Sequence, residues 1–172
     1  MTRPLLRKLA PLAPLALMGF LALPSVAEAA SPIRTQGNLG LGVGSGLYHS
    51  GLSVKYFAGA THSLQGVIGT HGYSGGLGFS GDYLYEMPTI IGDTTGIELG
   101  WAIGAGPSIG IDDNYLAIGA HGTIGLEINI QAVPIDIVLE YKPGFVIQDS
   151  DLDLDLYNFA GHIRFYPFGW KP

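Results

Sequence analysis

Apolar residues alternate with small or polar residues along most of the chain, and the alternation has a period of two. Between residues 39 and 44, for example, leucine or valine takes every second position and glycine takes the others. Successive side chains of an extended strand point to opposite faces, so the pattern predicts strands with one apolar and one polar face. After residue 30 no apolar run reaches the roughly 18 residues of a membrane-spanning helix.

Eight segments follow this pattern, and stretches rich in Gly, Pro, Ser, Asp and Asn, which turns require, separate them. The predicted strands are 38–44, 51–58, 63–73, 76–87, 97–106, 115–130, 135–147 and 156–165. The predicted turns are 45–50, 59–62, 72–75, 88–96, 107–114, 131–134 and 148–155. A tilted strand needs about 9–11 residues to cross a bilayer, and several of these segments have that length. We therefore expect an all-β fold, an eight-stranded antiparallel up-and-down transmembrane β-barrel.

The charged residues within these strands all fall on the face opposite the apolar one. They are Lys55, Asp82, Glu86, Glu98, Glu127, Asp136, Glu140, Lys142 and Arg164. A lysine or arginine that faces lipid at mid-depth costs about 2–4 kcal/mol, so the pattern is typical of a barrel with lipid outside. Because eight strands leave room only for side chains, we expect a lumen sealed by ion pairs. An open, ion-conducting lumen is the alternative.

The composition agrees with a membrane barrel. The 172 residues include 27 glycines, and charged residues make up 13%, against about 25% in a soluble domain. The absence of cysteine excludes disulfides, a thiol nucleophile and thiolate metal sites. After residue 30 the chain has 5 basic and 13 acidic residues, which makes nucleic acid a poor partner.

Residues 1–29 have the features of a secretory signal peptide. A positive start with Arg3, Arg7 and Lys8 precedes an apolar run from 9 to 23, and Ala27-Glu28-Ala29 has small residues at the cleavage spacing. The alternative is a retained membrane anchor, which the prolines in the short apolar run disfavour. We expect export, cleavage after Ala29 and one barrel domain over residues 30–172.

The last predicted strand is amphipathic and aromatic, with the sequence Phe159-Ala160-Gly161-His162-Ile163-Arg164-Phe165. With this strand and the eight-strand architecture, residues 36 to 168 resemble the small outer-membrane barrels of the OmpA transmembrane-domain and OmpX type. The resemblance implies a monomer in the outer membrane of a Gram-negative bacterium, surrounded by outer-membrane lipid. It also implies insertion by the barrel-assembly machinery and a structural or surface-interaction role, in which the surface ligand is unknown. In that topology the long 88–96 connection faces the periplasm.

The histidines raise the question of catalysis, because an outer-membrane lipid-modifying enzyme with a His-Ser-acid set is an alternative function. His49-Ser50 and His62-Ser63 are adjacent pairs in predicted turns. Adjacent side chains of an extended segment point to opposite faces and are poorly placed as base and nucleophile, so we predict no enzyme activity. We expect His121 and His162 to join the polar network of the lumen. The histidine spacings suit no local metal pair, and we expect no metal and no cofactor.

Aspartate takes every second position from Asp149 to Asp155. The pattern is similar to a calcium-binding loop, but Leu154 and Ala160 stand where such a loop has glycine and glutamate. We expect a solvated loop, and loose binding of a divalent cation is the alternative.

A soluble periplasmic barrel that binds an apolar ligand, as lipocalins do, is a third possible function. Such a barrel would turn its apolar face inward and its charges outward. The sidedness of Leu139 and Glu140, which are adjacent in the chain, therefore distinguishes this alternative from a membrane barrel.

Overall fold

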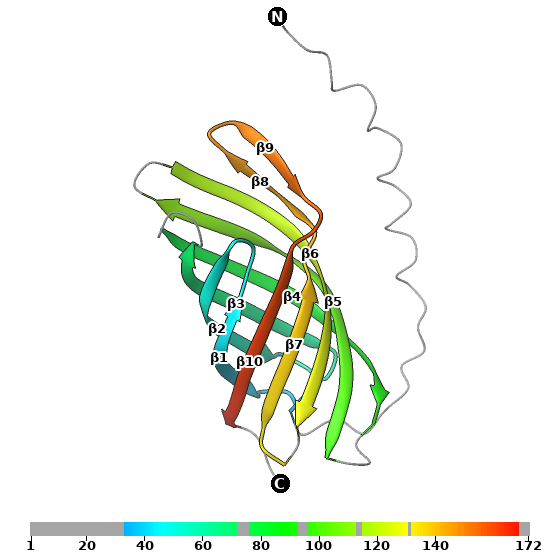
Figure 1. Ribbon diagram of the computed structural model, residues 1–172. Helices are drawn as coiled ribbons and strands as arrows, with labels where there is room; N and C mark the ends of the chain where they lie inside the picture. Colours follow the sequence, from blue (N-terminus) through cyan, green and yellow to red (C-terminus); the bar gives the residue numbers. More distant parts are fainter. Residues whose placement is uncertain (1–32, 72–75, 93–95, 113–114, 131, 169–172) are drawn as a thin grey trace, which may run out of the picture.

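The structure is a computed structural model, and it describes residues 33–71, 76–92, 96–112, 115–130 and 132–168. The predicted signal peptide lies outside these residues. The described residues form ten strands in one antiparallel sheet (Figure 1). The strands are β1 (Leu39–Ser45), β2 (His49–Phe57), β3 (His62–His71), β4 (Leu77–Ile91), β5 (Ile97–Asp112), β6 (Tyr115–Ile130), β7 (Ile135–Tyr141), β8 (Gly144–Gln148), β9 (Asp151–Asp155) and β10 (Phe159–Phe168).

Eight of these strands form the wall of a closed barrel. Strands β1 to β6 each pair with the next one along the chain, and β10 pairs with both β7 and β1. The ring closes where Gly42 of β1 lies opposite Arg164 of β10. The prediction of an all-β, eight-stranded, antiparallel up-and-down barrel is thereby confirmed.

The seventh predicted strand, 135–147, is wrong as one element because it is divided into β7 and β8. The break falls at Lys142 and Pro143, and proline has no N–H to donate to a strand ladder. Strand β7 pairs with β6 and β10, whereas β8 pairs with β6 and β9. The β8–β9 hairpin therefore projects beyond the closed ring at one end of the barrel (Figure 1).

The predicted turn at 148–155 is also wrong, because most of it is strand β9. Only Asp149 and Ser150 form the turn, and both have positive φ, 49° and 74°, as a two-residue hairpin turn of the primed type requires. Aspartate is a poor strand former, which hid β9 in the sequence pattern. The eighth predicted strand begins three residues later than expected, at Phe159, and extends to Phe168.

The predicted turns at 88–96 and 107–114 are also wrong in extent, because the prediction began each turn at a proline that in fact lies within a strand. Strand β4 continues to Ile91 and β5 to Asp112, so residues 88–91 and 107–112 belong to strands instead of turns. Each proline lies where pairing between β4 and β5 is interrupted: the register shifts after Met87, and Pro107 has no partner in the β4 register. Sheets tolerate proline at such positions.

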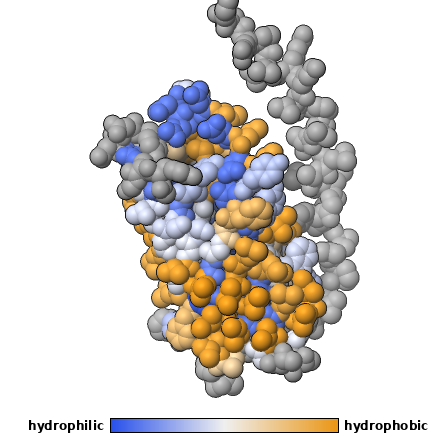
Figure 2. Space-filling model, in the orientation of Figure 1, coloured by the Kyte–Doolittle hydropathy of each residue, from blue (hydrophilic) through white to orange (hydrophobic). Residues whose placement is uncertain are grey.

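The two faces of the wall differ sharply in polarity. Leu139 is 61% exposed, while its neighbour Glu140 is 1% exposed. Among the described residues of the eight wall strands, no charged side chain points outward. Figure 2 shows apolar residues over the lower part of the visible face and hydrophilic residues gathered near the end with the β8–β9 hairpin. Met87 departs from the alternation: it has the same parity as the exposed Tyr83, yet it is 7% exposed, at the register shift of β4.

The segment before β1 fills the other end of the barrel. Ile33 packs with Phe57 at the end of β2 and with Tyr166 of β10, and all three are fully buried. Asn38 donates a 2.8 Å hydrogen bond to the carbonyl of Ile33. These contacts bring Arg34 into the interior, where it is 6% exposed. The segment 33–38 therefore forms a plug, which the sequence pattern did not predict.

Candidate functional site

The polar interior contains the charged side chains that the alternation placed there, and all nine are buried. Near the plug, Lys55 of β2 forms ion pairs with Glu86 at 2.9 Å and with Glu127. Arg34 donates a 2.8 Å hydrogen bond to Glu86 and lies 3.8 Å from Glu98. The expectation of ion pairs inside the barrel is confirmed, and two bases share these three carboxylates.

A second cluster lies around Lys142. Its ammonium group is 2.9 Å from Asp82 and 3.0 Å from Glu140. Each of these carboxylates also binds a histidine, as expected: His121 lies 2.6 Å from Asp82, and His162 lies 2.9 Å from Glu140. One lysine and two imidazoles thus surround two carboxylates.

The third cluster joins the last two strands of the wall. Arg164 of β10 binds Asp136 of β7, and its Nη2 lies 2.8 Å from Oδ2. Tyr166 donates a 2.7 Å hydrogen bond to the same carboxylate. Gln65 of β3 accepts a hydrogen bond from Arg164 and donates one of 3.0 Å to Glu140. The amide therefore links this cluster to the one around Lys142.

Arg34 is the main interior residue that sequence reasoning missed. It precedes the first strand, where no periodicity indicates a direction for the side chain. The glycines of β1 make room for side chains of β10. Side chains at Gly40 and Gly44 would meet the rings of Tyr166 and His162.

The structure brings together a serine, a histidine and an acid that the sequence did not suggest. Ser53 Oγ lies 3.0 Å from His162 Nδ1, and His162 Nε2 lies 2.9 Å from Glu140. The order resembles a nucleophile, a base and an orienting acid. All three side chains are at most 2% exposed, and Lys142 also binds Glu140. A substrate therefore has no access to Ser53 in this arrangement.

The two adjacent His-Ser pairs begin strands instead of lying in turns. His49 is buried at the start of β2, whereas Ser50 is exposed. In the second pair, His62 is exposed and lies 2.6 Å from the hydroxyl of Tyr83, while the buried Ser63 donates to an interior carboxylate. In each pair the two side chains lie on opposite faces of the strand.

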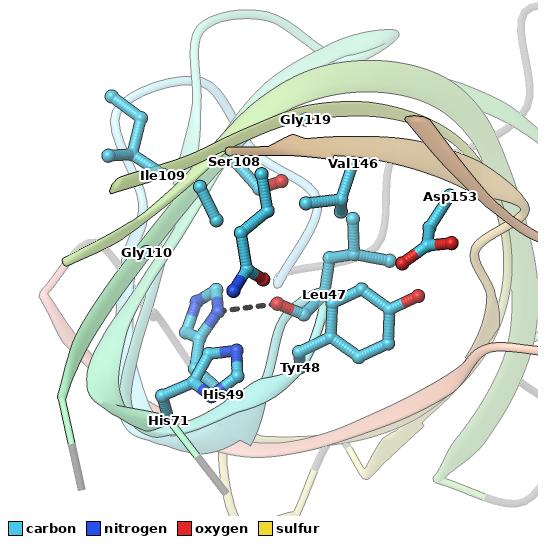
Figure 3. A pocket seen from close by; sticks show the side chains of 12 residues that line it. Leu47, Tyr48, His49, His71, Ser108, Ile109, Gly110, Gly119, Val146 and Asp153 are labelled. Carbon is cyan, nitrogen blue, oxygen red and sulfur yellow. Dashed lines mark hydrogen bonds between the residues drawn. The ribbon is translucent and has the colours of Figure 1, made fainter. Parts of the chain in front are cut away.

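A cavity of about 240 Å³ lies at the end of the barrel that carries the β8–β9 hairpin (Figure 3). Its lining includes Tyr48 of the β1–β2 turn, His49, His71 and Asp153 of β9. Tyr48 points toward Asp153, and the two histidines lie on the opposite side (Figure 3). Burial and a hydrogen bond to Asp155 raise the pKa of Tyr48.

Strand β9, which supplies Asp153 to the cavity lining, carries two more aspartates. Asp151, Asp153 and Asp155 alternate with Leu152 and Leu154, so the three carboxylates share one face of the strand. Burial tends to raise the pKa of Asp155, but hydrogen bonds, first among them one from the backbone of the residue two positions on, outweigh it and lower that pKa. Within the described residues, no three His, Asp or Glu side chains are grouped to hold a metal ion.

No helix in the described part of the chain is long and apolar enough to cross a membrane. The chain matches no protein-family model, no curated protein and no solved structure.

Proposed function

We propose that this chain is an integral β-barrel protein of a bacterial outer membrane, with a structural or surface-interaction role and an ion-paired, sealed lumen. The sidedness of the wall carries the proposal. Within the described residues, the outward side chains of the wall strands are uncharged, and all four basic side chains lie inside. In water this distribution would expose apolar surface and bury costly charge, whereas against lipid the outward face is well solvated.

The extent of the apolar surface supports the same proposal. In the described part of the chain, 31 large apolar side chains are exposed, and they occur on every strand of the wall. Soluble monomers rarely expose apolar patches larger than a few hundred Å², and larger patches mark protein or membrane contacts. A surface that surrounds the barrel fits lipid better than a single partner protein.

The alternative hypothesis, a soluble barrel that binds an apolar ligand, requires apolar side chains inside and charged side chains outside. Its interior would be apolar, yet Lys55, Glu127 and Arg164 are among the largest fully buried side chains here. A lipid-modifying enzyme needs an accessible nucleophile beside a base, whereas Ser53, which lies beside His162, is fully buried. We therefore do not propose either activity.

Export and assembly complete the proposal. We infer that residues 1–29 are a cleaved signal peptide and that the barrel-assembly machinery recognises the last strand. On β10, Phe159, Ile163 and Phe165 are exposed and alternate with the buried His162 and Arg164. This amphipathic, aromatic strand supports the resemblance to the OmpA transmembrane-domain and OmpX type. It also supports insertion of the barrel into the membrane as a monomer.

Fractionation of a Gram-negative host that expresses the full chain tests the proposal. We expect the protein in the outer-membrane fraction, resistant to carbonate extraction. Boiled and unboiled samples should migrate differently in detergent gels, since a closed barrel has no free edge from which to unravel. Recovery in the soluble periplasmic fraction would overturn the membrane assignment. Steady single-channel conductance in planar bilayers would overturn only the sealed lumen.

A further inference from the structure

The cavity beside the β8–β9 hairpin is not filled by the ion-paired interior. Its volume of about 240 Å³ is enough for roughly eight water molecules, at about 30 Å³ each. Pockets for drug-sized ligands have about 300–1,000 Å³. A ligand of this cavity is therefore a small molecule.

Tyr48 enters the cavity from a strained backbone position. Its φ is +64°, in the left-handed region, which bulky residues rarely adopt and glycine adopts freely. The ring lies 6.3 Å from that of His71, centroid to centroid, and the hydroxyl bonds to Asp155. Backbone strain of this kind persists only where the surrounding structure holds the residue in place, and it is often found at ligand sites. The turn thus fixes an aromatic ring at the mouth of the cavity.

The charge around the cavity is negative. Asp153 lines it, and no basic side chain among the described residues pairs with this carboxylate. The four described bases all bind interior carboxylates instead. Asp151 and Asp155 lie on the same face of β9 and add to the field, which attracts cations to this end of the barrel.

His49 forms part of the cavity wall. Its Nδ1 lies 2.8 Å from the carbonyl of Leu47, so Nδ1 carries the proton and donates (Figure 3). The residue is 3% exposed, so its ring bounds the cavity without presenting a free polar atom to it.

We propose that this cavity binds a small organic cation, an amine carried on an apolar or aromatic body. The Asp153 carboxylate and the ring face of Tyr48 both favour positive charge and N–H donors. Leu47 and Ile109 supply apolar contacts for the body of the ligand. The proposal concerns the cavity alone and holds whether or not the barrel lies in a membrane.

Calorimetric titration of the full chain in dodecyl maltoside tests the proposal, with 2-phenylethylamine as the probe. Two molecules of matched shape, neutral 2-phenylethanol and anionic phenylacetate, serve as ligand controls. We expect saturable binding of the amine at a ratio of one per barrel and little or no binding of the other two. Equal binding of 2-phenylethanol would mean that the cavity selects apolar shape alone and would overturn the cation assignment, as would the absence of saturable amine binding.

Two variants distinguish amine binding in this cavity from a general attraction of amines to an acidic surface. Asp153→Asn should weaken amine binding about tenfold, the effect of losing one charge-assisted hydrogen bond. Asp151→Asn is the matched control, because it removes the same charge from the same face of β9 but does not line the cavity. Equal losses in both variants would contradict a specific site.

Tyr48→Gly provides a variant that is expected to fold, because glycine adopts the positive φ without strain. Amine binding should fall at least as far as in Asp153→Asn, while resistance to urea stays at or above that of the parent. If a folded Tyr48→Gly barrel binds the amine as tightly as the parent, the aromatic ring is not part of the binding site and the proposal is overturned.

Discussion

Arg164 and Asp136 form a cross-strand ion pair between the last two strands of the wall. Arg164 Nε donates to both carboxylate oxygens, at 3.0 and 3.1 Å, and both residues are at most 1% exposed. Arg164 also lies opposite Gly42 of β1, where the ring closes. The pair therefore stabilises the barrel at its seam.

Removal of this cation should destabilise the barrel strongly. Arg164→Ala leaves the buried carboxylate of Asp136 without its base, which costs about 3–5 kcal/mol. Arg164→Lys should recover only part of the loss, because lysine lacks the planar fork that binds both carboxylate oxygens. Urea unfolding of the refolded chain in detergent measures both effects. An Arg164→Ala protein that unfolds like the parent would mean that the lumen is hydrated and open.

Arg34 offers a test of the plug. Arg34→Ala removes the base nearest to Glu86 and Glu98 and should reduce the free energy of unfolding by about 3 kcal/mol or more. Gln36→Ala changes an exposed residue of the same segment and should stay within about 0.5 kcal/mol of the parent. Equal stability of the two variants in urea would show that the segment does not bind the interior.

A charged substitution should be tolerated less on the outward face of the wall strands than in a turn. Leu139→Arg places a cation on the apolar face of β7 and should reduce folding into lipid vesicles, at a cost of about 2–4 kcal/mol at mid-depth. Val133→Arg is the control, since Val133 is 50% exposed in the turn before β7. Heat-dependent migration in gels reports the folded fraction. Comparable folding of both variants would contradict a lipid-facing wall.

Two glycines of the wall should respond differently to the same added methyl group. A Cβ at Gly42 would collide with the backbone of Ile163 and Arg164, whereas at Gly66 the nearest atom is 3.7 Å away. Gly42→Ala should therefore lower the free energy of unfolding by about 1–3 kcal/mol through overpacking at the seam. Gly66→Ala should be close to neutral or slightly stabilising. Urea unfolding distinguishes them, and equal effects would place the seam elsewhere.

The hairpin end of the barrel should loosen in acid. Since hydrogen bonds lower the pKa of Asp155 in the folded chain despite its burial, the carboxylate stabilises the hairpin above its unfolded pKa. That contribution is lost as the pH falls below the unfolded pKa and through the lower folded pKa. Amide exchange at Tyr157, which donates a 3.0 Å hydrogen bond to Asp155, should accelerate there. Asp155→Asn should abolish the pH dependence, and its persistence would assign the transition to another group.

Much of the wall could be predicted because strand alternation is a local property. Leu139 and Glu140 fall on opposite sides from their positions alone, and the same logic places Lys55 and Asp82 inside. Local rules failed where the backbone departs from regular alternation. The break at Pro143 and the primed turn before β9 depend on which neighbouring strand is available for pairing.

Partners within the interior could not be predicted from the sequence. Arg34 and Glu86 are 52 positions apart, and only closure of the ring and folding of the plug bring them to 2.8 Å. The Ser53–His162 contact spans 109 positions for the same reason. Long-range pairs of this kind depend on strand register and on the path of irregular segments, which carry no periodic signal.

The sequence by itself determined that the chain forms eight antiparallel wall strands with charge on one face, because side-chain direction alternates along every strand. Only the tertiary structure decided which carboxylate each base binds, that a fourth base enters from the plug, and that a cavity remains beside Tyr48. These features arise from the packing of side chains from distant strands into one narrow lumen, where the space left by one residue is filled by another.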